Sequence, residues 1–344
     1  MALDNRIDYI GIRTRASKLP IIQVDIDLSN HCNYDCSYCG PWFNGGTTEW
    51  CDYKKLVSFL ESVLLQNPET IIFLQLKGGE PTQWPDLNKF LEVISTYDNI
   101  YVGIITNLSR TKRFWQEINY SRVTRVLASF HAAQADTTQF LENAKVLWDH
   151  SDSIAISLLL LMDKPYFEKI SDLKNRLENL EHPYDKLTRV TSPVRVLLPN
   201  DTVTQYSNEE EEIINSLKGN FEVPQPKNHA SQDWLTTIKD VNEHSLENSP
   251  PDDESLENKL QEEQLDYRGW KCYAGIRKLM IDSNGDIYGA QCKIMKLGNL
   301  NSTWEFNTEP VTCSIRYCCC LSDIQIPKYN PKYVNKTLAD LETT

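Results

Sequence analysis

The sequence predicts an α/β fold built on a parallel sheet, followed by a smaller region that contains a β-hairpin. From residue 20 to about 200, strand-like runs alternate with helix-like runs, which is the pattern of stacked βα units. After residue 270, two short strand-like runs flank Asp282-Ser283-Asn284-Gly285, and an Asn-Gly pair in such a turn is a hairpin signal. These two observations set the fold class.

The first predicted strand is an alternating apolar stretch that includes Ile22, Val24 and Ile26. The predicted strands are 21–28, 70–76, 100–105, 123–129, 154–161 and 194–198. The predicted helices between them are 53–66, 85–97, 111–118, 137–151 and 164–180. Ligands of such a fold gather where the strands end, so motifs at the carboxyl ends carry the functional signal.

Beyond the alternating region, Asn208 and four glutamates open a short predicted helix. A polar, acidic stretch punctuated by prolines follows, which is either a solvated face or a lid over the sheet. The hairpin strands are predicted at 276–281 and 286–290, with Cys272 before the first and Cys292 after the second. We therefore expect these two thiols to meet at the open end of the hairpin.

The composition is that of a globular protein, with 40% hydrophobic and 24% charged residues among 344. The chain has no apolar run of membrane-spanning length and its N-terminus lacks the apolar centre of a signal peptide, which predicts a cytoplasmic protein. A net charge of −13 argues against sequence-independent nucleic-acid binding. Ten cysteines in a reducing compartment favour metal or cluster ligation over disulfides.

The most informative motif is the C-x3-C-x2-C loop formed by Cys32, Cys36 and Cys39 after the first predicted strand. Three thiolates are one short of the four that close an ordinary cubane iron–sulfur cluster, so one iron stays open for an outside ligand. A zinc site is the alternative, and the absence of a fourth ligand nearby makes zinc a poor fit.

This loop, together with Gly78-Gly79-Glu80-Pro81 after the second predicted strand, resembles the radical S-adenosylmethionine (SAM) superfamily. The resemblance implies a partial (β/α)6 barrel of the TIM type. It also implies a [4Fe-4S] cluster on the three cysteines, with SAM on the open iron. Tyr38 is then expected to pack near the adenine, and the Gly-Gly-Glu-Pro turn to hold the SAM amino group. Taken alone, the Gly-Gly pair is an ordinary tight turn.

Further site residues follow from the strand ends. Thr106 and Asn107 stand where the family often has Thr-Asn-Gly, with Leu108 in place of the glycine. The resemblance assigns Ser129 to SAM and Leu160 to adenine packing. His131 is predicted as a catalytic acid or base on the substrate side, with a structural hydrogen bond as the alternative.

The C-terminal cysteines resemble those of the twitch domain, a shortened SPASM domain that binds one auxiliary [4Fe-4S] cluster. Cys272 and Cys292 are the firmest predicted ligands, Cys313 and Cys318 complete the set, and Cys320 is the alternate. A zinc site closed by four cysteines is the other interpretation. Cys51 and Cys319 stay unassigned. The predicted regions are an N-terminal segment at 1–19, the core at 20–204, an acidic connector at 205–268, the auxiliary-cluster domain at 269–325 and a tail at 326–344.

The resemblance implies reductive cleavage of SAM to a 5′-deoxyadenosyl radical that abstracts hydrogen from the substrate. Few residues precede the first strand, which favours a small polar substrate such as a sugar, an aminocyclitol or a nucleotide-linked metabolite, in a dehydrogenation or epimerisation. Modification of a peptide or protein side chain is the alternative. A two-cluster electron-transfer or iron-sensing protein is the non-enzyme alternative. The enzyme is expected to need a one-electron reductant such as flavodoxin or ferredoxin, and no nucleic-acid or membrane partner.

Overall fold

The computed structural model describes residues 21–150, 154–179, 188–191, 206–218 and 267–315, together with positions 318, 323, 326, 328 and 329. Within these ranges the chain forms a nine-stranded sheet and a separate three-stranded sheet. The predicted strand 194–198, together with Cys319 and Cys320, lies outside the described residues.

Six parallel strands pair in chain order and form the body of the large sheet. They are β1 (Ile21–Asp27), β2 (Ile71–Lys77), β3 (Ile100–Thr106), β4 (Val123–Phe130), β5 (Ala155–Leu161) and β6 (Thr188–Thr191). The α/β prediction is confirmed. The first five strands lie within one residue of the predicted bounds at each end, because runs of aliphatic residues bounded by polar ones mark them locally.

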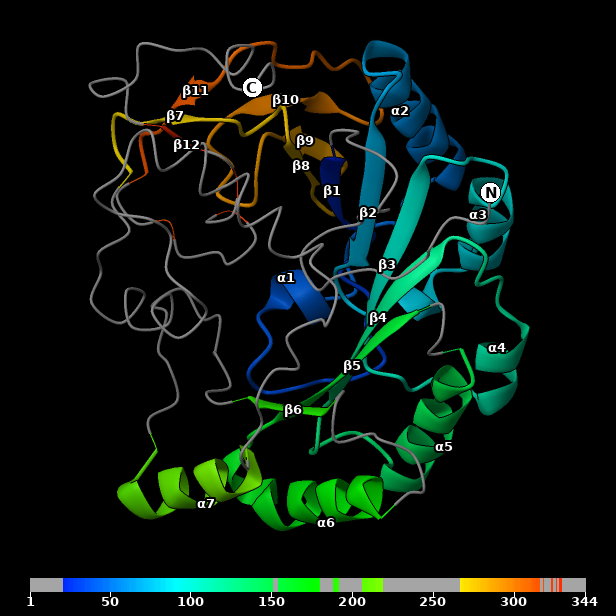
Figure 1. Cartoon of the computed structure of the whole chain (residues 1–344), viewed down its shortest axis with the longest axis vertical. Coiled ribbons are helices and arrows are strands. Elements are labelled where there is room, and N and C mark those ends of the chain that lie inside the picture. Colours follow the sequence, from blue (N-terminus) through cyan, green and yellow to red (C-terminus); the bar gives the residue numbers. More distant parts are fainter. Residues whose placement is uncertain are drawn as a thin grey trace.

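The helices between these strands cover one face of the sheet, and Figure 1 shows α2 to α6 in a row along that side. They are α2 (Tyr53–Gln66), α3 (Leu87–Ile94), α4 (Lys112–Glu117), α5 (Thr137–Trp148) and α6 (Phe167–Glu178). Side chains at three helix starts accept hydrogen bonds from first-turn N–H groups: Asp52 for α2, Thr111 for α4 and Asp136 for α5. These caps explain why the predicted starts of α2 and α5 are correct.

The shorter elements complete the chain. They are α1 (Pro41–Asn44), the 3-10 turns η1 (Pro81–Gln83) and η2 (Lys164–Tyr166), and α7 (Asn208–Lys218), which is the predicted acidic helix. The C-terminal strands are β7 (Lys271–Cys272), β8 (Lys278–Ile281), β9 (Asp286–Tyr288), β10 (Lys296–Asn299), β11 (Val311–Thr312) and β12 (Lys328–Tyr329).

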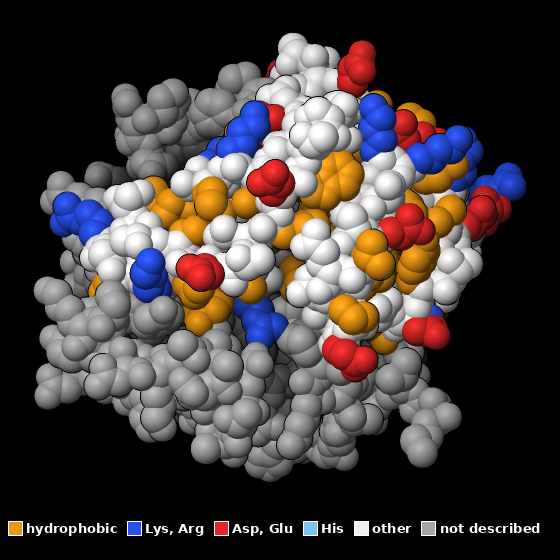
Figure 2. Space-filling view, turned by 90° about the horizontal axis from the view of Figure 1, so that it is seen from above, with side chains coloured by type: hydrophobic (Ala, Val, Ile, Leu, Met, Phe, Trp, Pro, Cys, Tyr) orange, Lys and Arg blue, Asp and Glu red, His pale blue; other side chains and the backbone are white. Residues whose placement is uncertain are grey.

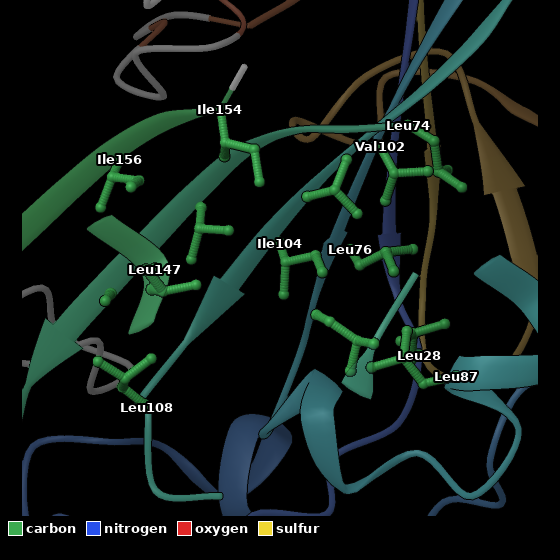
Figure 3. Packing of buried hydrophobic residues seen from close by; sticks show 14 of the residues in the cluster. Leu28, Leu74, Leu76, Leu87, Val102, Ile104, Leu108, Leu147, Ile154 and Ile156 are labelled. Carbon is green, nitrogen blue, oxygen red and sulfur yellow. The ribbon is translucent and has the colours of Figure 1, made fainter. Parts of the chain in front are cut away.

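The hydrophobic core lies between the strands and their helices. Leu74 and Leu76 from β2 and Val102 and Ile104 from β3 point into it, as Figure 3 shows. Alternate residues of the same strands face the opposite side of the sheet, as strand geometry requires. On β1 and β2 that opposite face is polar at Gln23, Asp25, Asp27, Gln75 and Lys77. The sheet therefore has one apolar face and one face with buried polar side chains.

The predicted hairpin is present as β8 and β9, with Gly285 at φ 79° and its N–H bonded to Asp282 O. Its location differs from the sequence-based division of the chain. Strand β8 pairs in parallel with β1 and continues the large sheet, in the order β10-β9-β8-β1-β2-β3-β4-β5-β6. Only β7, β11 and β12 form a sheet of their own. Strand β1 gains a partner on its open side, which removes an exposed sheet edge.

Candidate functional site

The sequence motifs meet at the carboxyl ends of the parallel strands. The cysteine loop follows β1, the Gly-Gly-Glu-Pro turn follows β2, Asn107 follows β3 and His131 follows β4. Because parallel strands end at the same edge, chemistry-bearing side chains that lie far apart in sequence converge there.

The three thiols of the loop differ in exposure and lie within electrostatic reach of one another. Cys36 is buried, while Cys32 and Cys39 are half-buried. The Cys32 sulfur accepts hydrogen bonds from the backbone N–H of Tyr34, at 3.4 Å, and from Asn107 Nδ2, at 3.9 Å. The pKa of Cys32 is raised to about 11, mainly by burial, with smaller contributions from the charges of Glu80 and Cys36.

The two glycines after β2 are required by the close approach of the chain that leads into the cysteine loop. A Cβ on Gly79 would lie 2.0 Å from His31 O, and one on Gly78 would lie 2.5 Å from Ser29 O. The N–H groups of Gly79 and Glu80 donate to Ser29 O and His31 O, at 2.9 and 2.7 Å. The turn therefore packs directly against residues 29–31 and fixes where the loop begins.

Glu80 is buried, and its carboxylate joins the ends of β2 and β3. Its Oε1 accepts from the hydroxyls of Thr82, at 2.5 Å, and Thr106, at 2.7 Å, and from Thr82 N at 3.0 Å. Its Oε2 accepts from Asn107 N at 2.6 Å. Burial raises the pKa of this carboxyl, and the donors oppose the shift. The residue predicted to hold an ammonium thus also has a structural function.

The end of β3 is held by its own polar side chains. Asn107 Nδ2 reaches the cysteine loop at Asn33 Oδ1, at 3.0 Å, besides its contact with Cys32. The backbone of Leu108 has φ 58°, the left-handed conformation in which the family's glycine is the ordinary residue. Leu108 keeps this conformation because its side chain is buried in the helix-covered core (Figure 3).

The predicted residues on β4 and β5 occupy different places. Ser129 is buried at the end of β4. Leu160 lies in the helix-covered core, on the face opposite to the loop. The next residue, Leu161, packs against Cys36 and Tyr38 instead. Leu160 and Leu161 thus lie on different faces of the sheet, because adjacent strand residues face opposite sides.

His131 contacts the cysteine loop directly. Its Nδ1 lies 2.8 Å from Tyr38 Oη and 3.5 Å from Cys36 Sγ. The Tyr38 and His131 rings stack with centroids 5.9 Å apart. These contacts correspond to the structural alternative stated for His131.

Asn30 is a site residue that the sequence did not reveal. Its Oδ1 accepts from the N–H groups of Thr47 and Thr48, at 2.9 and 2.8 Å, and its Nδ2 donates to Thr47 Oγ1. These bonds join the two ends of the segment 30–48, which contains the three cysteines. An asparagine that bonds residues seventeen or eighteen positions away leaves no local sequence signal.

Comparison with known proteins gives the site its family. Residues 26–156 match the family model of the Radical SAM superfamily, and this range contains the cysteine loop, the Gly-Gly-Glu-Pro turn, Asn107 and His131. Residues 26–156 are a radical SAM domain.

The curated relatives share this domain at low identity. A GTP 3′,8-cyclase of Campylobacter lari is 28% identical over 139 residues, which are 39% of this chain and 42% of that protein. A GTP 3′,8-cyclase of Campylobacter curvus is 27% identical over 128 residues, 36% of this chain and 38% of that protein. The matched region thus spans about two fifths of the length of these relatives.

Among solved structures, native anSMEcpe with bound AdoMet is 13% identical, with a TM-score of 0.47 over 83% of this chain and 79% of that one. BtrN in complex with AdoMet and 2-DOIA is 13% identical, with a TM-score of 0.37 over 82% and 78%. Likeness at this level carries no information about the substrate of this chain.

The radical SAM family implies a [4Fe-4S] cluster and SAM, and the cysteine loop fits the cluster. Burial raises the pKa of Cys32 to about 11. The hydrogen bond with Cys39, together with burial, raises the pKa of Cys36 to about 12. Each of these thiols therefore needs adjacent positive charge to ionise, which cluster iron supplies. In the described ranges, no three His, Cys, Asp or Glu side chains surround one metal-ion position. A cubane does not require that arrangement, because each thiolate binds a different iron.

Outside the radical SAM domain, four C-terminal thiols lie in one neighbourhood. Cys272 interacts electrostatically with Cys313, and Cys318 with both Cys272 and Cys292. Burial raises the pKa of both Cys292 and Cys318 to about 12. Cys320, the alternate ligand, lies outside the described residues.

The described surface is mixed in charge. On the face seen in Figure 2, Lys and Arg side chains are interspersed with Asp and Glu. No helix in the described ranges combines the length and the apolar character needed to cross a membrane.

Proposed function

We propose that the chain is a radical SAM enzyme that acts on a small polar substrate, such as a sugar, an aminocyclitol or a nucleotide-linked metabolite, by dehydrogenation or epimerisation. The observation that carries this proposal is the convergence of the cysteine loop with the Gly-Gly-Glu-Pro turn and Asn107 at one edge of the sheet. An electron carrier has no need for an ammonium-binding carboxylate beside its cluster.

In the proposed enzyme, Cys32, Cys36 and Cys39 hold the cluster, and the segment Gly78–Pro81 with Thr106, Asn107 and Ser129 binds SAM. When bound, the cluster and SAM together supply a radical that removes hydrogen from an unactivated carbon. The residues of this chain orient the partners and exclude water from the reacting groups. The electron comes from an external donor such as flavodoxin or ferredoxin.

The polar face of β1 and β2 supports a polar substrate. Asp27 and Lys77 form an ion pair of 2.7 Å at the strand ends, and both side chains keep some exposure. Deeper on the same face, Gln75 is buried, and within the described ranges its Nε2 has no hydrogen-bond partner. A buried amide donor without a partner is costly, and an acceptor on a bound molecule would satisfy it.

The names of the curated relatives make a nucleotide the first substrate to test, since these proteins are called GTP 3′,8-cyclases. GTP falls within the proposed class of small polar substrates. Because each match covers about two fifths of the relative, the specific cyclisation is not carried over to this chain.

We further propose that Cys272, Cys292, Cys313 and Cys318 hold an auxiliary [4Fe-4S] cluster. Besides the convergence of the thiols, one buried cation supports an anionic centre. Lys328 is buried and donates to Asp323 O and Ile326 O. Burial raises the pKa of both Cys272 and Cys318, and the charge of Lys328 opposes that rise. Asp323 accepts from the backbone N–H of Cys292 at 2.7 Å and so fixes that ligand.

The decisive experiment is anaerobic reconstitution with iron, sulfide, SAM and dithionite, followed by measurement of 5′-deoxyadenosine. We expect the wild-type protein to form 5′-deoxyadenosine and the Cys36→Ala variant to form none, because two thiolates do not hold the cluster. Cys51→Ala is the matched control and keeps activity, since Cys51 lies outside the loop. Product from Cys36→Ala would contradict the ligand assignment.

The same assay separates the substrate classes. GTP, a panel of sugars and aminocyclitols, and short peptides encoded near the gene are added in parallel, and products are detected by mass spectrometry. A hydrogen-depleted or epimerised small molecule supports the proposal, and a modified peptide replaces it with the peptide alternative. Two intact clusters with no cleavage under any condition would favour the electron-transfer alternative.

A further inference from the structure

His131 is enclosed by aromatic side chains of the cysteine loop. The Tyr38 ring stacks on the imidazole at an interplanar angle of 15°, and Tyr34 contacts it edge-on with centroids 6.0 Å apart. The imidazole Nδ1 faces Tyr38 Oη at 2.8 Å and Cys36 Sγ at 3.5 Å. The Nδ1 atom of His131 therefore contacts two residues of the cysteine loop.

The backbone of His131 is held as firmly as its ring. The carbonyl of His131 accepts from the N–H groups of Gln134 and Ala135, at 2.9 and 2.8 Å. Lys169 from α6 donates to the carbonyls of Ala132 and Ala135. Gln134 Nε2 bonds Asp35 O in the cysteine loop at 3.3 Å. The turn after β4 therefore presents the imidazole in one fixed position.

The chemistry of a ligated cysteine decides the direction of these bonds. A thiolate bound to iron has no proton, so Cys36 Sγ only accepts. His131 Nδ1 lies 3.5 Å from this sulfur, so its N–H is the donor of the bond. Tyr38 Oη, at 2.8 Å from the same nitrogen, then accepts from the shared N–H.

We propose that His131 is a positioning residue for Cys36, which donates a hydrogen bond from Nδ1 to its sulfur and raises the reduction potential of the cluster, and that Tyr38 holds the imidazole in place for this bond. The inference rests on the proposed function, because it requires the cluster on this loop. Donors to cluster sulfurs stabilise the reduced state, which carries the extra negative charge. His131 then acts on the electron-accepting step and not as an acid or base on the substrate.

The test is an EPR-monitored redox titration of the full-length reconstituted protein at one fixed pH, following the cluster signal that changes when SAM is added. We expect a more negative midpoint potential for His131→Phe, with iron and sulfide per chain unchanged. Tyr38→Phe, which keeps the ring stacking, is expected to shift the potential in the same direction. His131→Asn, which retains an amide donor near Nδ1, is expected to stay closer to the wild-type value.

His150→Phe is the matched control, since His150 also stacks on a tyrosine, Tyr120, with centroids 4.1 Å apart. His150 lies between α5 and β5 and Tyr120 lies before β4, at the edge of the sheet opposite to the loop. Its midpoint should equal that of the wild type. If His131→Phe loses the cluster, Tyr38→Phe carries the test. Wild-type potentials in His131→Phe or Tyr38→Phe would overturn the inference while leaving the proposed function intact. A wild-type protein without a SAM-responsive signal would overturn both.

Discussion

At the scale of single residues, the Gly-Gly-Glu-Pro turn packs against the start of the cysteine loop with the same residues that are proposed to bind SAM. The glycines of the Gly-Gly-Glu-Pro turn are needed because residues 29–31 leave no room for a Cβ. Glu80 accepts four hydrogen bonds from three residues on two neighbouring strand ends. A motif that resembles a SAM-binding signature is therefore also the packing joint that places the cysteine loop.

Replacing Glu80 with Gln tests this double function. In the wild type both oxygens of the Glu80 carboxylate accept hydrogen bonds. In the variant an NH2 group replaces one of these oxygens and cannot accept, so at least one buried donor loses its partner, at a cost of about 1–3 kcal/mol. We expect this loss in the free energy of unfolding measured by urea denaturation. Glu61→Gln is the control, because Glu61 is exposed and its hydrogen bond from Tyr97 Oη lies at the surface. Unchanged stability with weakened SAM binding would show that Glu80 serves only the ligand.

At the scale of elements, one buried ion pair joins two strands from opposite ends of the chain. Lys278 Nζ on β8 lies 2.8 Å from Asp25 Oδ2 on β1, and both side chains are almost fully buried. Gln23 Nε2 bonds the other Asp25 oxygen at 2.9 Å. The pair specifies which strand covers the open side of β1, because β8 in another register would leave both charges unpaired.

Substitution of Lys278 by Met should destabilise the sheet, since it leaves a buried carboxylate without its cation. We expect a loss of about 3–5 kcal/mol in urea unfolding, and partial recovery in the double variant that adds Asp25→Asn. Lys89→Met removes a surface ion pair and should change stability by about 0.5 kcal/mol or less. A Lys278→Met protein as stable as the wild type would show that the pair does not hold β8 to β1.

At the scale of the whole molecule, the C-terminal region is divided between two sheets. Strands β8, β9 and β10 belong to the large sheet, whereas β7, β11 and β12 form the small one. The region also contacts α2, where Trp304 Nε1 donates to Ser62 Oγ and Trp304 packs against Phe59. The four C-terminal thiols are therefore held on a structure continuous with the radical SAM domain.

The iron content of the whole protein tests the second cluster. Two cubanes give about eight irons and eight sulfides per chain. We expect Cys292→Ala to fall to about four of each while still cleaving SAM, since Cys292 lies outside the radical SAM domain. Cys51→Ala should keep the wild-type count. An unchanged iron content in Cys292→Ala would remove the auxiliary cluster from the proposal.

The sequence by itself determined the first five strands, the helices that follow them and the hairpin, because aliphatic runs and side-chain caps act over a few neighbouring residues. It also located the cysteine loop and the Gly-Gly-Glu-Pro turn, which are local motifs. The tertiary structure alone decided that β8 completes the large sheet, that Asn30 closes the cysteine segment and that His131 bonds Cys36. These contacts join residues from 17 to more than 250 positions apart, as in the pair Asp25 and Lys278. Only the packed chain brings such partners together, so no local pattern records them.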